Sequence, residues 1–346
     1  MRADRQFFLL RPQQLPRSRA ELVATIPITA ALHTMRRATP PAPNEDALQA
    51  AREALSQLGV TNQCLTPVVD ETDESPDNRA NDEVFHIVRV EGQTFPLLVH
   101  STLQGFVALL EEALSAGAKL TPVEWSRLRT AFAVLFETFR GEPVSEEMPP
   151  EAIVAPEPPA AARCDRQQNA LQRWTRGHHM FMVVIQGLVV IFNCLRHELE
   201  ASNLRAADAL LRAATRLMMG VGPALRFTGD FGYSEYEKEV RPTLTPPAAP
   251  PGLSGLYWRD HEYLMKLLAR MRPMLMNLDA SLRDHLHPLH EALATAYESH
   301  KFVCGSFVGS ERSSLLMASR TQQPAVETLD HFKRVRLQLV KPPVIS

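Results

Sequence analysis

The feature that most constrains the fold is a run of mostly apolar residues at 180–194, interrupted by two polar residues and a glycine. A membrane-spanning helix needs about 20 apolar residues, so this shorter run predicts a helix buried inside the protein. It lies within a longer helical pattern at 169–201 that is apolar nearly all round in its middle. Because such a helix must be surrounded by partners, the chain is predicted to be mainly α-helical.

Apolar residues at helical spacing predict further helices along the chain. The clearest signal is Thr121-Pro122-Val123-Glu124, which combines an N-cap, a proline at N1 and the N3 glutamate of a capping box, with an end near Gly141. The segment after residue 304 is predicted to be a tail. The other predicted helices cover 44–58, 103–114, 204–220, 256–278 and 288–304.

Only one strand pattern stands out, at residues 84–90 and 95–99, and it predicts a small N-terminal β-hairpin. Residues 142–162 are rich in Pro, Glu and Ala and predict an exposed linker. With 346 residues, 45% of them hydrophobic, the chain can bury a sizeable core. We therefore predict an N-terminal helical region with the hairpin (1–141), the linker, and a helical catalytic body (163–346).

Charge and cysteine content exclude several classes of function. A formal net charge of −2 offers no general attraction for nucleic acid or an anionic membrane, so neither is a predicted partner. The apolar run at 7–10 is too short for the core of a signal peptide. Four scattered cysteines without a CxxC pair disfavour a disulfide framework and a zinc knuckle: Cys64, Cys164, Cys194 and Cys304. Together these features predict a cytoplasmic protein.

The candidate functional residues are two histidines and a cysteine on two predicted helices. His300 and Cys304 are four residues apart, so they project from one helix face, one turn from each other. His261 shares an apolar face of the preceding helix, which Pro273 should kink in its second half. Two antiparallel helices would then each present a histidine within an apolar stripe. Such a slot suits haem, because an apolar wall buries the porphyrin while neutral imidazoles ligate the iron.

A purely structural role fits the same residues. A single histidine on an apolar face is more often a hydrogen-bonded core residue, and a buried cysteine often behaves as a small hydrophobe. Zinc generally takes three or four protein ligands, and His285, His287 and His290 are spaced more like a solvated helix start than a metal cluster. Three classes of function therefore stay open: a haem enzyme, a bis-histidine haem electron carrier or sensor, and a haem-free helical interaction protein.

The pattern of His261, His300 and Cys304 resembles that of the haem-dependent 3-methyl-L-tyrosine hydroxylase family of saframycin-type antibiotic biosynthesis. That family is similar to the tryptophan 2,3-dioxygenase and haem tyrosine hydroxylase superfamily. The histidines are 300 − 261 = 39 residues apart, similar to the family's spacing, and Cys304 completes an HxxxC motif. The resemblance runs from about residue 165 to 310 and includes residues 227–231 and 241–243.

The resemblance implies a helical body in which His261 and His300 are axial ligands of a ferric haem and Cys304 forms a single thioether bond to a haem vinyl group. It also implies hydroxylation of 3-methyl-L-tyrosine, or a related tyrosine, ortho to the phenol hydroxyl. The product would be a catechol for tetrahydroisoquinoline antibiotic biosynthesis, and the oxidant would be peroxide or dioxygen plus a reductant such as ascorbate. Because Cys304 tethers the helix of His300, we expect His261 to be displaced on activation and to be the catalytic residue.

Substrate contacts are expected in the irregular segment 226–255, because loops on a rigid helical frame often carry binding residues. A tyrosine-like substrate needs a partner for its carboxylate, and the arginine fork matches the two oxygens. The candidates are Arg241, Arg226, Tyr233, Tyr236 and Ser254. Each fits a surface or turn role equally well. His178 and His179 are candidates for an acid/base group. The expected partners are the tyrosine-derived substrate and the oxidant, with a homo-oligomer left open.

Overall fold

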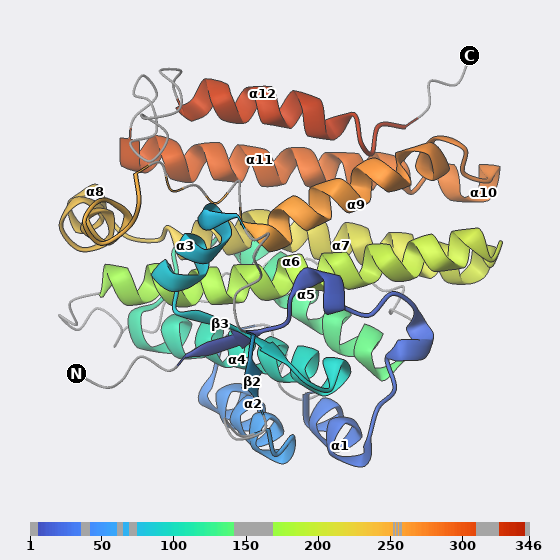
Figure 1. Cartoon of the computed structure of the whole chain (residues 1–346), viewed down its shortest axis with the longest axis horizontal. Coiled ribbons are helices and arrows are strands. Elements are labelled where there is room, and N and C mark those ends of the chain that lie inside the picture. Colours follow the sequence, from blue (N-terminus) through green and yellow to red (C-terminus); the bar gives the residue numbers. More distant parts are fainter. Residues whose placement is uncertain are drawn as a thin grey trace.

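The computed structural model shows a mainly helical protein in which long helices are stacked around a central one (Figure 1). The predicted fold class is therefore confirmed. The residues that the structure describes are 6–35, 42–60, 65–68, 75–141, 169–251, 253, 255, 258–308 and 325–342.

The central helix is α6 (Ala170–Glu200), the predicted buried helix. Its N-terminus is capped by the side chain of Asn169, which accepts a hydrogen bond from the Gln172 amide. It packs against α4 (Thr94–Ala116), α7 (Leu204–Thr228) and α9 (Arg259–Met276). These neighbours bury its apolar circumference, as the sequence predicted.

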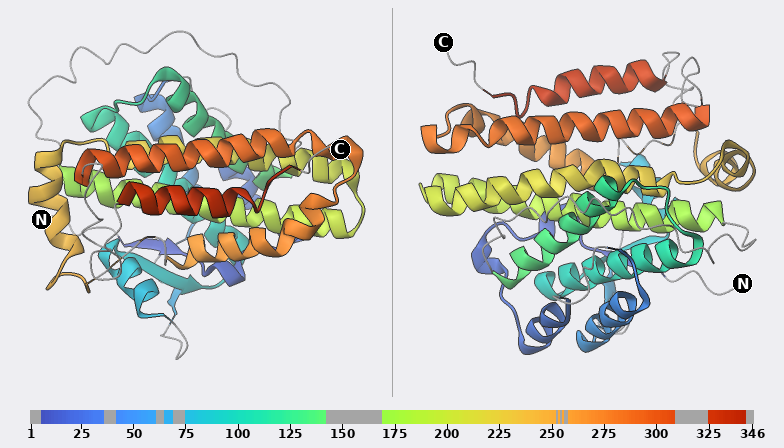
Figure 2. Two further views of the ribbon diagram at one scale, coloured as in Figure 1. Left: turned by 90° about the horizontal axis from the view of Figure 1, so that it is seen from above. Right: turned by 180° about the vertical axis from the view of Figure 1, so that it is seen from behind.

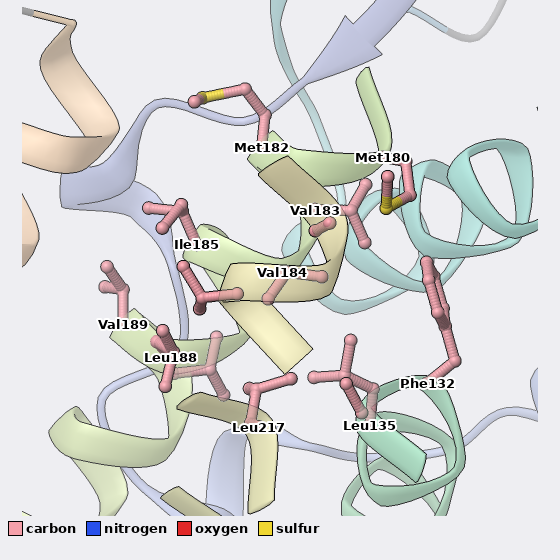
Figure 3. Packing of buried hydrophobic residues seen from close by; sticks show 14 of the residues in the cluster. Phe132, Leu135, Met180, Met182, Val183, Val184, Ile185, Leu188, Val189 and Leu217 are labelled. Atoms are coloured by element: carbon pink, nitrogen blue, oxygen red, sulfur yellow. The ribbon is translucent and has the colours of Figure 1, made fainter. Parts of the chain in front are cut away.

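Side chains of α6 interdigitate with those of its neighbours at the centre of the protein. Figure 3 shows Val184 and Leu188 gathered with Leu217 of α7 and Leu135, which lies on α5 (Pro122–Arg140). All four are at most 1% exposed. Gly187 allows the close approach, because a Cβ atom there would lie 2.3 Å from a Leu135 methyl carbon. The core is therefore continuous between helices from both halves of the chain.

Two helices, α4 and α6, are long and apolar enough to cross a membrane by length and composition. Within the protein, 78% and 89% of their most apolar windows are buried against other elements. That burial is typical of core helices. It agrees with the interpretation of residues 180–194 as part of the core.

Local capping signals predicted two other helices correctly. Helix α2 (Glu45–Gln57) starts at Asn44, whose side chain accepts a hydrogen bond from the Ala47 amide. Helix α5 has the predicted capping box between Thr121 and Glu124, and it ends at Gly141 with a left-handed φ of 71°. Such a C-terminal glycine adopts this conformation without steric cost.

The predicted β-hairpin is wrong in its second strand. Strand β3 (Ile87–Glu91) is present, but it pairs in parallel with β1 (Phe7–Leu9) and antiparallel with β2 (Thr66–Pro67). Residues 95–99 instead form the first turns of α4. Proline at position 96 explains the difference, because its missing N–H is harmless in a first helical turn but would interrupt a strand ladder.

Helix α7 continues beyond its predicted end at Gly220 to Thr228. Its glycines serve packing, because a Cβ atom at Gly220 would lie 2.5 Å from the Ala131 side chain, and one at Gly222 would lie 2.6 Å from Ser299 Oγ. Ser299 belongs to α11 (Leu286–Val308). The small residues therefore let α7 approach α5 and α11 closely.

The segment predicted as a C-terminal tail contains helix α12 (Ala325–Leu337). Figure 2 shows α12 lying along α11, and the two helices pack together.

The predicted linker at residues 142–162 lies outside the described residues, and the division of the chain there stays a prediction. The shorter elements are η1 (Pro12–Gln14), η2 (Arg19–Glu21), α1 (Ile26–Thr34), α3 (Pro76–Val84), α8 (Tyr233–Glu235), η6 (Tyr236–Val240), η7 (Arg241–Leu244) and α10 (Ala280–Arg283).

Candidate functional site

A cavity of about 270 Å³ is bounded by α6, α7, α9, α11 and α12. Most of its wall is aliphatic or aromatic, which suits an apolar, flat ligand. Trp258, just before α9, is 1% exposed and stacks on Phe85 with ring centroids 4.8 Å apart. Representative apolar lining residues are Phe181, Ile185, Leu188, Leu264, Leu293 and Phe307.

His261, His300 and Cys304 all line this cavity. His261 lies in the first turn of α9, whereas His300 and Cys304 lie one turn apart on α11. The structure therefore brings the three residues to one cavity from two helices. Their roles as ligands and attachment point stay predictions.

Burial controls the protonation of the groups in the cavity. It lowers the pKa of His300 to about 4, with a smaller contribution from the Arg336 cation. Burial also raises the pKa of the Cys304 thiol to about 11. At neutral pH the imidazole is therefore neutral and keeps a lone pair for a metal. The cysteine stays a thiol, which disfavours it as a thiolate ligand.

His178 and His179 differ in their positions. His178 lines the cavity, donates from Nδ1 to the Trp174 carbonyl oxygen at 2.8 Å, and has its pKa lowered to about 3 by burial. The ring of His179 stacks on Phe7 with centroids 4.3 Å apart, and its Nε2 is hydrogen-bonded to the Phe85 carbonyl oxygen. Of this pair, only His178 is placed where a ligand in the cavity could meet it.

Arg336 and Tyr297 give the cavity a polar end that sequence reasoning missed. Arg336 Nη1 donates to His261 Nε2 at 3.1 Å and to the Tyr297 hydroxyl. Both residues line the cavity, Tyr297 from α11 and Arg336 from α12. Helix α12 was not predicted from the sequence, so this contact was missed. The HxxxC motif begins one turn after Tyr297 and does not indicate the contact.

Tyr236 is the one predicted substrate contact that the described structure places on the cavity wall. Its ring stacks on Phe307, with centroids 4.4 Å apart and an interplanar angle of 7°. Burial raises the pKa of its hydroxyl to about 12, so the phenol stays protonated at neutral pH.

Three of the other candidates for substrate contact lie away from the cavity. Arg226 pairs with Glu124 at 3.0 Å and lies over the Phe302 ring, and Arg241 pairs with Glu237 on its own turn. The Tyr233 side chain is 52% exposed. None of these three lines the cavity, and Ser254 lies outside the described residues. The cavity therefore gives no support to their predicted contact with substrate.

The three histidines near the start of α11 were not predicted to form a metal cluster, and this stays a prediction. His285 pairs with Asp208 of α7 at 2.6 Å. Among the described residues, no group of three or more His, Cys, Asp or Glu side chains is arranged to hold a metal ion.

A buried ionic network holds the start of α9, directly before His261. Asp260 is 0% exposed and binds Arg89 of β3, with Arg89 Nη2 2.5 Å from Asp260 Oδ2. Arg89 Nη2 also donates to Asp82 of α3 at 2.9 Å. Gln186 of α6 donates to Asp260 Oδ1 at 2.8 Å, and the Trp258 indole donates to Asp82.

This network assigns a role to the N-terminal part of the chain. Arg89 belongs to the small sheet, and it also donates to the Leu10 carbonyl oxygen next to β1. Through Asp260 the sheet fixes the helix turn that carries His261. A buried charge pair of this kind requires good geometry and several hydrogen bonds to offset its desolvation. Here the groups that form these hydrogen bonds belong to α3, β3, α6 and α9.

Fold and cavity together define a mainly helical protein with an apolar cavity that is lined by the neutral histidines His178 and His300 and by His261. Residues 8–291 match the family model described as SfmD 3-methyl-L-tyrosine peroxygenase. The chain belongs to this family and is an enzyme. The family resemblance predicted from the HxxxC pattern is thereby confirmed, although the matched region ends before His300.

Individual relatives match over most of the chain. The 3-methyl-L-tyrosine peroxygenase of Streptomyces lavendulae is 38% identical over 337 residues, which are 96% of this chain and 89% of the relative. A crystal structure of reduced SfmD, obtained by soaking with sodium hydrosulfite, is 35% identical. It covers 88% of this chain and 99% of its own, with a TM-score of 0.68.

Proposed function

We propose that this enzyme binds haem in the cavity and uses peroxide to hydroxylate 3-methyl-L-tyrosine, or a closely related tyrosine, ortho to the phenol hydroxyl. One observation carries the proposal: His261, His300 and Cys304 reach one apolar cavity from two helices. The names of the relatives, 3-methyl-L-tyrosine peroxygenase and reduced SfmD, support both the substrate class and a redox-active centre. The proposed reaction is balanced, because an aromatic C–H and hydrogen peroxide give a phenolic C–OH and water. The catechol would serve a tetrahydroisoquinoline antibiotic pathway.

The residues of the cavity fit a haem. Aliphatic and aromatic side chains offer the porphyrin an apolar wall, and His300 is neutral because burial lowers its pKa to about 4. We propose that His261 and His300 would ligate the iron and that Cys304 would form a thioether bond to a vinyl group. A neutral imidazole has one lone pair, so for His261 the iron would replace the hydrogen bond from Arg336. A bound haem would supply the oxidising chemistry, while the chain positions the phenol and limits access of water. Tyr236 and His178, both on the wall, are the polar groups that we assign to that task.

The two histidines are held differently, which suggests that only one leaves on activation. His300 shares helix α11 with Cys304, so a thioether would keep its helix against the macrocycle. His261 lies on α9 and has no such covalent link. The Asp260 network holds its helix turn, so the displacement that we propose is a movement of the His261 side chain. We therefore propose that His261 would leave the metal when substrate binds or the iron is reduced.

This displacement predicts a change of spectrum. The resting ferric protein should be six-coordinate and low-spin, and adding 3-methyl-L-tyrosine or a reductant should convert part of it to a five-coordinate form. Optical and EPR spectra measure the conversion, with the His261→Ala variant as the reference for a protein that lacks this ligand. Spectra that stay six-coordinate under every addition would remove His261 as the displaced ligand.

The thioether is tested with Cys304→Ala. Acid–acetone extraction should leave the wild-type chain heavier by one haem in intact mass spectrometry, whereas the variant should release its haem completely. The matched control is Cys194→Ala, because Cys194 is buried in α6 and does not line the cavity. If the wild-type protein also released all of its haem, the covalent attachment would be excluded.

Two histidines on one cavity also fit a haem protein that carries electrons, and this is the alternative that the geometry favours next. It would bind haem but form no hydroxylated product from 3-methyl-L-tyrosine and peroxide. A purified protein without a Soret band, despite haem supply during growth, would instead indicate that the three residues belong only to the helical core.

A further inference from the structure

We propose that Arg336 and Tyr297 form a carboxylate-binding site at the polar end of the cavity. This inference rests on the proposed function, which brings two kinds of carboxylate into the cavity: the propionates of haem and the carboxylate of the amino-acid substrate. Neither residue stood out in the sequence. The structure places them side by side, on α11 and α12.

The charge of the cavity wall favours an anion at this end. Histidines aside, Arg336 is the only ionisable cation among the described residues that line the cavity, and no acidic residue is among them. Its recorded partners are His261, Tyr297 and the faces of the Tyr297 and Phe332 rings, 5.7 and 4.9 Å from the guanidinium carbon. Within the described part of the chain, no carboxylate forms an ion pair with it. A half-buried guanidinium beside an apolar cavity is costly unless it is paired.

Hydrogen-bond donors are available for a ligand at the same place. Both hydrogen bonds of Arg336 use Nη1, which leaves the N–H groups of Nη2 and Nε for a ligand. The Tyr297 hydroxyl accepts from Arg336, so its own O–H can donate to a ligand, and burial keeps this phenol protonated by raising its pKa. Parallel N–H groups of arginine match the two oxygens of a carboxylate.

The other arginines considered for this role lack these properties. Arg226 and Arg241 already pair with Glu124 and Glu237, and neither lines the cavity. Arg336 is therefore the arginine that meets both requirements, since it faces the cavity and is not neutralised by a described carboxylate.

The experiment compares each acid with a neutral analogue of the same shape. The haem-free protein is titrated with iron mesoporphyrin IX, which lacks vinyl groups and cannot bond to Cys304, and with its dimethyl ester. The haem-loaded protein is titrated with 3-methyl-L-tyrosine and with its decarboxylated amine. The variants are Arg336→Gln, Arg336→Lys and, as a control, Arg334→Gln, because Arg334 is exposed on the same helix and does not line the cavity.

We expect Arg336→Gln to weaken binding of at least one acid by roughly ten- to a hundredfold, the range for hydrogen bonds to charged groups. Its neutral analogue should bind as it does to the wild type, which also shows that the variant is folded. Arg336→Lys should recover part of the loss because it keeps the charge but not the fork. Arg334→Gln should behave as the wild type.

The two sources are told apart by which acid is affected. A loss confined to mesoporphyrin assigns Arg336 to a propionate, and a loss confined to the amino acid assigns it to the substrate. Unchanged affinity for both acids, or equal losses for acids and neutral analogues, would overturn the carboxylate site. A wild-type protein that binds neither porphyrin would overturn the proposed haem function itself, and the carboxylate site with it.

Discussion

Replacing His300 by alanine is expected to remove most haem binding and to lower peroxygenase activity more than about a hundredfold. Loss of residues that only support a metal ligand already costs about 10- to 100-fold in affinity or activity, and His300 is proposed as the ligand itself. Burial lowers its pKa to about 4, so the imidazole is neutral and able to ligate at neutral pH. Haem content from the Soret band and catechol yield from chromatography measure the two effects.

The contrast between the two histidines sharpens this test. His261→Ala should keep more haem than His300→Ala, because His300 and Cys304 remain on α11. His290→Ala is the control, since His290 lies on the same helix but not on the cavity wall. If His300→Ala kept the haem content and spectrum of the wild type, the proposed ligand pair would have to be abandoned.

Replacing Arg89 by methionine is expected to lower the free energy of unfolding by about 3–5 kcal/mol, the cost of breaking a buried ion pair from one side. Asp82 and Asp260 would be left in the interior without their shared cation. Arg52→Met is the matched control, because Arg52 pairs with Glu111 at 2.7 Å but its side chain is 49% exposed. Such an exposed pair contributes about 1 kcal/mol or less. Chemical denaturation of the three proteins gives the comparison.

The loss of stability caused by Arg89→Met should increase with pH. Burial already raises the pKa of Asp82 above its ordinary value in the presence of Arg89, and removing the cation should raise it further. The folded variant then binds protons more strongly than the unfolded chain, so its stability should fall as the pH rises above about 4. The difference in free energy of unfolding between the variant and the wild type should therefore shrink as the pH falls towards about 4. A defect that is the same at every pH would point to lost packing instead of unpaired carboxylates.

Local patterns in the sequence predicted much of the fold. The apolar run at 180–194 predicted α6, the capping box at Thr121 and Glu124 predicted the start of α5, and the i, i+4 spacing predicted that His300 and Cys304 share a face. Each of these patterns consists of residues that are close together in the sequence. For that reason a single sequence shows them without an alignment or a structure.

The missed features depend on contacts between distant residues. Arg89 and Asp260 are 171 positions apart, and Arg336 and His261 are 75 apart. An isolated arginine or aspartate in a sequence looks like a surface residue, so neither the network nor the polar end of the cavity could be predicted. The error in the hairpin is only partly of this kind. The pairing of β3 with residues 7–9 is a contact between distant residues, whereas Pro96 is a local signal that favours a first helical turn over a strand.

The position of α12 in the chain has a consequence for how the enzyme is made. Thr328, Leu329 and Arg336 complete the cavity wall, and α12 follows every other lining element in sequence. Since a chain emerges from the ribosome N-terminus first, α4 to α11 can assemble while this side of the cavity is still open. The cavity therefore gains this side of its wall only after α12 has been synthesised and has docked on α11.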